Sequence, residues 1–160
     1  MAAFHQHSDH VLVGAGCFGA STALYLKKMF PQKSVTLIDR TPFPNPSAAA
    51  HDLNKIIPAE YEDKVYMKLA LEAQSLWRSD PVLKPYYHEM GILFVGIPGP
   101  GITIVENYKA VRESSPATLI EPEEAKAKFD GIYRDAPWDK LGVTGCTWNP
   151  SAGWGEAENA

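Results

Sequence analysis

Apolar residues form two short runs near the start of the sequence, with a glycine-rich turn and an amphipathic stretch between them. His10–Val13 has the pattern of a buried strand, and residues 34–40, "SVTLIDR", are rich in β-branched residues and end in an acid and an arginine. Residues 17–30 carry apolar positions on one helical face and two lysines in the last turn, with Pro31 directly after. This pattern predicts a strand, a helix and a second strand, which together form a βαβ unit.

The pattern changes after residue 40. Residues 41–52, "TPFPNPSAAAHD", contain three prolines and predict an irregular loop whose backbone is accessible to a bound group. Residues 59–80 have the longest helical periodicity in the chain. We expect the apolar stripe of that helix to pack against a sheet; it consists of Val65, Leu69, Ala73 and Leu76.

The remainder of the chain predicts shorter elements. These are a strand over 91–96, a turn over 97–101, a helix over 102–113, a helix that begins at Pro122, and weak strands between 131 and 154.

Composition and charge limit the function classes. A chain of 160 residues with 45% hydrophobic and 21% charged residues is typical of one globular domain. The net charge of −4 and the scattered Lys and Arg residues give no electrostatic reason to expect nucleic acid or an anionic membrane as a partner. No apolar run approaches the roughly 20 residues of a membrane-spanning helix.

The first nine residues read as a flexible polar leader before a domain over 10–160. His5, His7 and His10 could suggest a metal site, but we favour the polar leader and predict no metal. The two cysteines, Cys17 and Cys146, form no disulfide framework, which favours a cytoplasmic location.

Gly14, Gly16 and Gly19 form a G-x-G-x-x-G motif between the first strand and the first helix, and Asp39 follows at the end of the second strand. In that context the motif is the dinucleotide-binding fingerprint. Gly14 allows the tight turn, Gly16 lets a pyrophosphate approach the backbone, and Gly19 lets the helix pack closely on the strand.

The same fingerprint suggests roles for the residues around it. The N–H groups at the helix start, from Cys17 through Phe18 to Gly19, would bind the phosphates, and Asp39 would bind the hydroxyls of the adenosine ribose. Arg40 could hold the 2′-phosphate of a nicotinamide cofactor, although Asp39 would repel that phosphate; the other interpretation is a surface arginine. Cys17 is either a reactive thiol or, as we favour, a small residue that a tight loop tolerates.

The segments that follow resemble the N-terminal part of the fungal fructosyl amino acid oxidases (amadoriases). These are similar to the monomeric sarcosine oxidases, within the wider D-amino-acid-oxidase group of flavoproteins. The resemblance covers nearly the whole chain. It is carried by "SAAAHDLNKII" (47–57), "YEDKVYMKLALEAQSLWRSD" (61–80), "YYHEMGILFVG" (86–96) and "WNPSAGWGEAENA" (148–160).

The resemblance implies FAD as the cofactor and oxidation of the C–N bond of a secondary or glycated amine or amino acid. In that family O2 is the acceptor and H2O2 a product. The resemblance also implies that four residues lie along the flavin, namely Ser47, Asp52, Asn54 and Lys55. Lys55 matches a position that holds Lys or Arg beside the flavin ring, where a fixed cation stabilises negative charge, and we take it as the candidate catalytic residue.

Two features depart from the family pattern. Pro58 stands where the sarcosine oxidases have an arginine that binds the substrate carboxylate, so that contact is not expected here. Family members are also much longer, and the part beyond this chain supplies most of the substrate region and, in many members, a cysteine that carries FAD covalently. Cys146 does not occupy that position.

The sequence therefore predicts an α/β fold, an FAD/NAD(P)-binding Rossmann-like three-layer arrangement with an incomplete substrate region. The predicted function is that of an FAD-dependent amine or amino-acid oxidoreductase, or a truncated member of that class. Two alternatives are a catalytically inactive nucleotide-binding short form and an NAD(P)-dependent dehydrogenase domain. The expected partners are a small amine substrate and a further chain that completes the site.

Overall fold

The computed structural model describes residues 7–42, 44–96 and 98–158 of the 160-residue chain. It divides into two compact units, Met1–Leu53 and Asn54–Ala160. Most of the expected leader, including His5, lies outside the described residues. The division that the sequence suggests, a leader over 1–9 and one domain over 10–160, stays a prediction.

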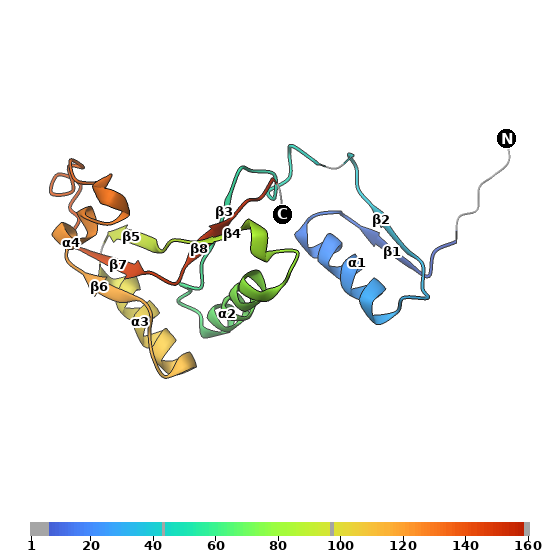
Figure 1. Cartoon of the computed structure of the whole chain (residues 1–160), viewed down its shortest axis with the longest axis horizontal. Helices are drawn as coiled ribbons and strands as arrows, with labels where there is room; N and C mark the ends of the chain where they lie inside the picture. Colours follow the sequence, from blue (N-terminus) through green and yellow to red (C-terminus); the bar gives the residue numbers. More distant parts are fainter. Residues whose placement is uncertain (1–6, 43, 97, 159–160) are drawn as a thin grey trace. The chain divides into compact units, whose positions relative to one another are not determined.

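The first unit is the expected βαβ unit (Figure 1). Strand β1 (His10–Val13) pairs in parallel with β2 (Val35–Ile38), and helix α1 (Cys17–Met29) connects them. Helix α1 ends where the sequence predicts, because the backbone N–H of Phe30 donates to Leu26 and Lys27 Nζ binds the carbonyl oxygens of Pro31 and Lys33.

The amino ends of these two strands are joined by a carboxylate. One oxygen of Asp9 accepts hydrogen bonds from the backbone N–H and the hydroxyl of Ser34, at 2.9 and 2.8 Å, and the other binds Lys33 Nζ at 2.8 Å. The hydrogen bond from Lys33, followed by those from Ser34, lowers the pKa of Asp9 far below its usual range.

The second unit contains two three-stranded antiparallel sheets. In one sheet β8 (Gly153–Gly155) lies between β3 (Lys55–Ile57) and β4 (Tyr87–Glu89). In the other sheet β7 (Gly145–Asn149) lies between two further strands, β5 (Ile92–Gly96) and β6 (Thr118–Ile120). Strands β7 and β8 follow one another along the chain, so the last described residues form the centre of both sheets (Figure 1).

Helices cover these sheets. The α-helices are α2 (Lys64–Ser79), α3 (Pro98–Arg112) and α4 (Pro122–Lys126), and the short 3-10 helices are η1 (Lys84–Tyr86) and η2 (Phe129–Gly131). Helix α2 begins later than residue 59 because Asp63 caps it, accepting hydrogen bonds from the N–H groups of Val65 and Tyr66. The turn expected over 97–101 is wrong from Pro98 onward, because α3 already begins there; Ile97 lies outside the described residues.

The apolar stripe expected to bury α2 is also wrong. Val65, Leu69 and Leu76 are 64%, 57% and 43% exposed. The buried side chains of the helix are Met67 and Gln74, with Ala70 and Leu71 packed beside Met67. The buried face includes a polar residue because the Gln74 amide donates to the carbonyl oxygen of Ile57 at 2.9 Å, so apolar periodicity alone selects the wrong face.

Two small groups of side chains form the core of the second unit. One group joins α2 to α3 and contains Ala59, Met67, Ile104, Tyr108 and Ala117. The other lies beneath α4 and contains Ala125, Trp138 and Cys146.

Among the described residues, no helix has the length and apolar character that crossing a bilayer requires. No group of three or more His, Cys, Asp or Glu side chains there is arranged to hold a metal ion.

Candidate functional site

The glycine motif forms a sharp turn between β1 and α1. Gly14 has a φ of 103°, which favours glycine, and its N–H donates to the carbonyl oxygen of Ile38 at 2.7 Å. A Cβ atom at Gly19 would overlap with the carbonyl oxygen of Gly14, so α1 packs directly against the turn. The turn role expected of Gly14 and the packing role expected of Gly19 are therefore confirmed.

Gly16 differs from the other two glycines. Its φ of −71° and ψ of −176° suit any residue, and a Cβ atom there would meet no atom within 4 Å. The backbone itself therefore does not require glycine at this position. A group that approaches the backbone closely would require it, which is the role the sequence predicts for the pyrophosphate.

The start of α1 suits an anion. Gly16 is the N-terminal cap, no side chain caps the helix, and its first turn contains no acidic residue. Cys17 and Phe18 are exposed, with Phe18 at 92%. The N–H groups at this end carry the positive end of the helix dipole, so the residues present fit a bound pyrophosphate.

Asp39 lies directly beside the turn. Its Oδ2 accepts a hydrogen bond from the N–H of Ala15 at 2.6 Å, and its Oδ1 accepts one from the N–H of Arg40 at 2.7 Å. The bond from Ala15 is the main reason that the pKa of Asp39 is lowered, so the carboxylate stays ionised at neutral pH. Arg40, the next residue after Asp39 at the same end of β2, is exposed.

The segment that leads out of the first unit is irregular, as expected. The N–H of Ser47 donates to Asn45 Oδ1, and the N–H of Leu53 donates to Asp52 Oδ1, both at 2.9 Å. Ser47 and Asp52 are exposed. Their flavin contacts stay a prediction.

Asn54 and Lys55 begin the second unit. Lys55 is the first residue of β3, it pairs with Gly155 of β8, and it is exposed. Its role beside a flavin also stays a prediction.

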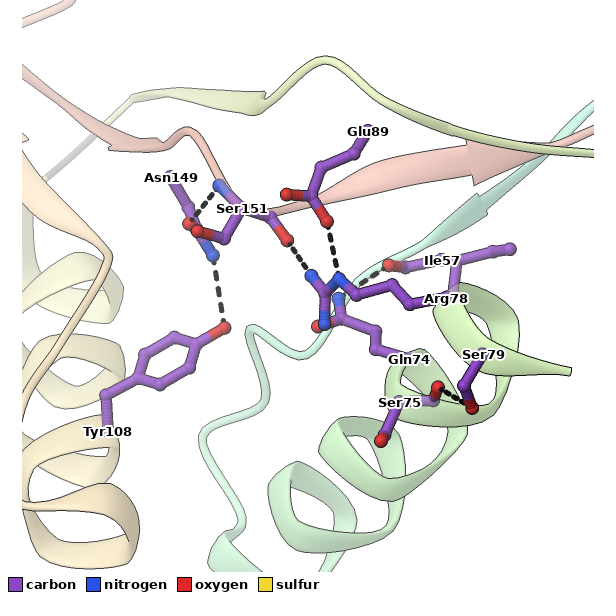
Figure 2. A network of polar contacts seen from close by, with 9 residues as sticks. All are labelled: Ile57, Gln74, Ser75, Arg78, Ser79, Glu89, Tyr108, Asn149 and Ser151. Atoms are coloured by element: carbon purple, nitrogen blue, oxygen red, sulfur yellow. Dashed lines mark hydrogen bonds and ion pairs between the residues drawn. The ribbon is translucent and has the colours of Figure 1, made fainter. Parts of the chain in front are cut away.

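A polar network fixes the sheet that carries Lys55 (Figure 2). Besides the bond from Gln74 to Ile57, Arg78 donates to Glu89 and to the carbonyl oxygen of Ser151, each at 2.5 Å. Asn149 accepts from the N–H of Ser151 at 2.8 Å. Helix α2 therefore holds β3, β4 and the turn between β7 and β8.

A second set of polar groups meets the same turn from α3. Tyr108 donates to the carboxylate of Glu60 at 2.9 Å, and the Asn149 amide donates to Glu60 and, at 3.1 Å, to Tyr108. Burial, and then the charge of Glu60, raise the pKa of Tyr108 far above its usual range, so the phenol stays protonated. Sequence reasoning did not find these residues, because each contact joins positions at least 41 residues apart.

The opposite face of the same sheet carries an imidazole and a carboxylate. Trp154 of β8 pairs with Ile56 on one side and His88 on the other, and the His88 and Trp154 rings stack at 4.3 Å. His88 Nε2 lies 2.7 Å from Glu156 Oε1. No local sequence pattern indicates this pair, because the two residues lie 68 positions apart.

Comparisons with known proteins agree on one family. The sequence model described as FAD dependent oxidoreductase matches residues 9–160. The L-saccharopine oxidase of Schizosaccharomyces pombe is 37% identical over 133 residues, which cover 79% of this chain and 31% of the relative. The monomeric sarcosine oxidase of Bacillus sp. (strain B-0618) is 30% identical over 132 residues, which cover 79% of this chain and 33% of the relative.

Among solved structures, the fructosamine oxidase of Aspergillus fumigatus (Amadoriase II) matches with a TM-score of 0.69 and 30% identity. That match covers 95% of this chain and 36% of the solved one. The chain thus spans about a third of the length of the relatives that it matches. The α/β class expected from the sequence is confirmed.

Proposed function

The chain belongs to the FAD-dependent oxidoreductase family, and from this premise we propose that it forms the FAD-binding part of an enzyme that oxidises the C–N bond of a secondary or glycated amine or amino acid. The relatives support this substrate class, since they are named as oxidases of saccharopine, sarcosine and fructosamine. O2 as the acceptor, with H2O2 as the product, belongs to the same proposal.

The observation that carries the proposal is the βαβ unit with its glycine turn. It combines open space beside Gly16, an α1 start without a side-chain cap or first-turn acid, and an ionised Asp39 at the turn. These are the groups that a dinucleotide needs for its pyrophosphate and its ribose.

The roles of individual residues follow from this arrangement. The backbone of Gly14 and Gly16 and the start of α1 would hold the pyrophosphate, and Asp39 would accept the ribose hydroxyls. The redox chemistry, acceptance of a hydride equivalent from the carbon beside the amine nitrogen, would be supplied by FAD when it is bound. Lys55 would place a positive charge beside the flavin ring, as the resemblance implies.

The residue after Ile57 limits the substrate. Pro58 carries no charge, so this position does not bind a substrate carboxylate as the arginine of the sarcosine oxidases is expected to do. A glycated or larger secondary amine, which offers further groups to bind besides a carboxylate, therefore fits the proposal better than sarcosine.

The substrate pocket is proposed to need further polypeptide. The chain spans about a third of its relatives, and polypeptide matching their remaining two thirds, in the same chain or in a partner chain, would complete it. A fungal source and a cytoplasmic location belong to the same proposal; a fungal relative supports the first, and the free Cys17 and Cys146 support the second.

The experiment that tests the function is a chimera. The N-terminal part of the S. pombe L-saccharopine oxidase that aligns with this chain is replaced by the aligned residues of this chain, and H2O2 production is measured with saccharopine as substrate. We expect bound flavin and peroxide above the background of the same chimera carrying Gly16→Val. A folded chimera that contains no flavin, or one whose activity survives Gly16→Val, would contradict the proposal.

A further inference from the structure

We propose that Asp39 is a positioning residue that holds the glycine turn in its nucleotide-binding form before any nucleotide arrives, by accepting the N–H of Ala15. This role is separate from the ribose contact expected of the same carboxylate. The benefit to nucleotide binding rests on the proposed function, but the contact itself lies within the first unit and is tested without FAD.

The pairing of the two strands brings the groups together. Val13 lies opposite Ile38 in the parallel β1–β2 pair, and the N–H of Gly14 donates to the carbonyl oxygen of Ile38. The carboxyl ends of the two parallel strands lie side by side. Ala15 and Asp39, which come shortly after those ends, therefore meet across the turn. Their hydrogen bond joins positions 24 residues apart and ties the turn to the end of β2 through a side chain.

The carboxylate is itself held in place. Its second oxygen accepts the N–H of Arg40 at 2.7 Å and, at 3.4 Å, the N–H of Thr41. An ionised carboxylate offers about four acceptor positions. Three N–H donors use the group, so one position is left for one of the two ribose hydroxyls, and the positioning role is compatible with that ribose contact.

The turn is constrained on its other side by the helix. Gly14 has its left-handed φ of 103°, and its carbonyl oxygen lies where a Cβ atom of residue 19 would have to be. Ala15 is thus fixed between the packed start of α1 and the carboxylate. A turn held in this way loses less conformational entropy when a phosphate binds, which raises affinity without any contact to the phosphate.

Asparagine at position 39 tests this arrangement with little change in shape. Its amide oxygen can accept one N–H, but its NH2 group would then face another N–H donor, either that of Ala15 or those of Arg40 and Thr41. Asp39→Asn therefore loses either the bond to Ala15 or the bonds to Arg40 and Thr41 that hold the side chain in place, and either loss loosens the joint between the turn and β2.

Asp9→Asn is the matched control. Asp9 makes the same kind of carboxylate-to-backbone bond, to Ser34, between the same two strands at their opposite end. The substitution Asp9→Asn removes one negative charge from the same unit and leaves the glycine turn untouched.

The first measurement is amide hydrogen exchange by NMR on the whole, nitrogen-labelled chain. We expect the Ala15 amide to be protected in the wild type and to exchange about tenfold faster or more in Asp39→Asn, the factor for losing a hydrogen bond to a charged group. The Ala20 amide, which donates to Gly16 within α1, serves as the internal reference. In Asp9→Asn the Ala15 amide should keep its protection.

The second measurement is the affinity for ADP and for inorganic pyrophosphate. If Asp39 only bound ribose, Asp39→Asn would leave pyrophosphate binding unchanged or strengthen it, because a negative charge is removed. If Asp39 also positions the turn, Asp39→Asn should weaken pyrophosphate binding several-fold, whereas Asp9→Asn should leave it unchanged.

An unprotected Ala15 amide in the wild type overturns the inference even if Asp39→Asn does not fold. Equal Ala15 exchange in the wild type and Asp39→Asn overturns it too. Failure of the wild type to bind FAD or ADP would instead count against the proposed function, and the Ala15 exchange rate would still decide the inference.

Discussion

At the scale of single residues, the three glycines of the turn differ in what they require. Gly14 and Gly19 are demanded by the protein's own backbone, through a positive φ and through the contact between α1 and the turn. Gly16 has ordinary dihedral angles and open space beside it. The chain's own backbone therefore does not require glycine at position 16, and the reason that remains is the close approach of a pyrophosphate that the sequence predicts.

Alanine substitutions separate these roles. Gly19→Ala forces a Cβ atom against the Gly14 carbonyl and should lower the free energy of unfolding by about 1–3 kcal/mol. Gly16→Ala should lower that free energy by less, about 0.5–1 kcal/mol, because its Cβ atom meets no other atom and alanine is only a poorer cap for α1. Urea denaturation of the two variants checks the prediction, and equal losses in both would contradict it.

The two cysteines should differ in reactivity. Cys17 is exposed at the start of α1, whereas Cys146 is 3% exposed in β7 and burial raises the pKa of its thiol. A thiol reagent at pH 8 should label Cys17 quickly and Cys146 only after denaturation. Cys17→Ser should abolish the fast labelling, and fast labelling in that variant would show that Cys146 is accessible.

The sequence predicted the glycine roles because they depend on a local strand–turn–helix pattern. It could not predict the contact of Ala15 with Asp39, because that bond joins residues 24 positions apart and depends on the register of β1 against β2. The same holds for the pairing of His88 with Glu156, which are 68 residues apart.

At the scale of elements, helix α2 shows where apolar periodicity misleads. The helix has apolar residues on more than one face, and the face that packs is the one on which Gln74 and Arg78 reach backbone carbonyls of the sheet. Strands β3, β4 and β6 were not predicted because each has only three residues, too few for an alternating pattern.

Two substitutions on α2 decide between its faces. Met67→Ala removes a fully buried side chain and should cost about 2–5 kcal/mol of unfolding free energy. Leu69→Ala alters a side chain that is 57% exposed in this structure and should cost about 0.5 kcal/mol or less. The order would be reversed if the stripe expected from the sequence were the packed face.

The β1–β2 pair should lose stability in acid. Asp9 and Asp39 both have lowered pKa values in the folded chain, so the stability they contribute is present above the unfolded pKa of about 4 and is lost as the pH falls through the folded values. The difference in urea midpoint between the wild type and Asp9→Asn should be constant above about pH 4 and shrink below it. A difference that grows in acid would contradict this assignment.

At the scale of the whole molecule, the α/β class, the family and the dinucleotide motif could be predicted, because the motif is contiguous. The substrate region could not, because the chain spans about a third of its relatives. The sheets of the second unit depend on β7 and β8, which were predicted only weakly because Gly, Pro and Trp obscure their pattern.

The 160-residue chain by itself should show little or no oxidase turnover. Positioning of a substrate against a reactive ring, with water excluded, supplies much of the rate of such enzymes. This chain provides the nucleotide turn and one candidate charge, Lys55, for the flavin. A peroxide-coupled assay with FAD and glycated amino acids, sarcosine or pipecolate checks this, and sustained H2O2 production would refute it.

The central claim is that the glycine turn binds the dinucleotide of FAD. Its most direct test is a titration of FAD into the purified chain, followed by flavin fluorescence, with the wild type and Gly16→Val side by side. The account predicts saturable binding by the wild type and none by Gly16→Val, while the variant stays folded and melts within a few degrees of the wild type, because the valine meets no atom of the chain and costs only the poorer cap at the start of α1. Equal binding by the two proteins, or no binding by the wild type, would contradict it.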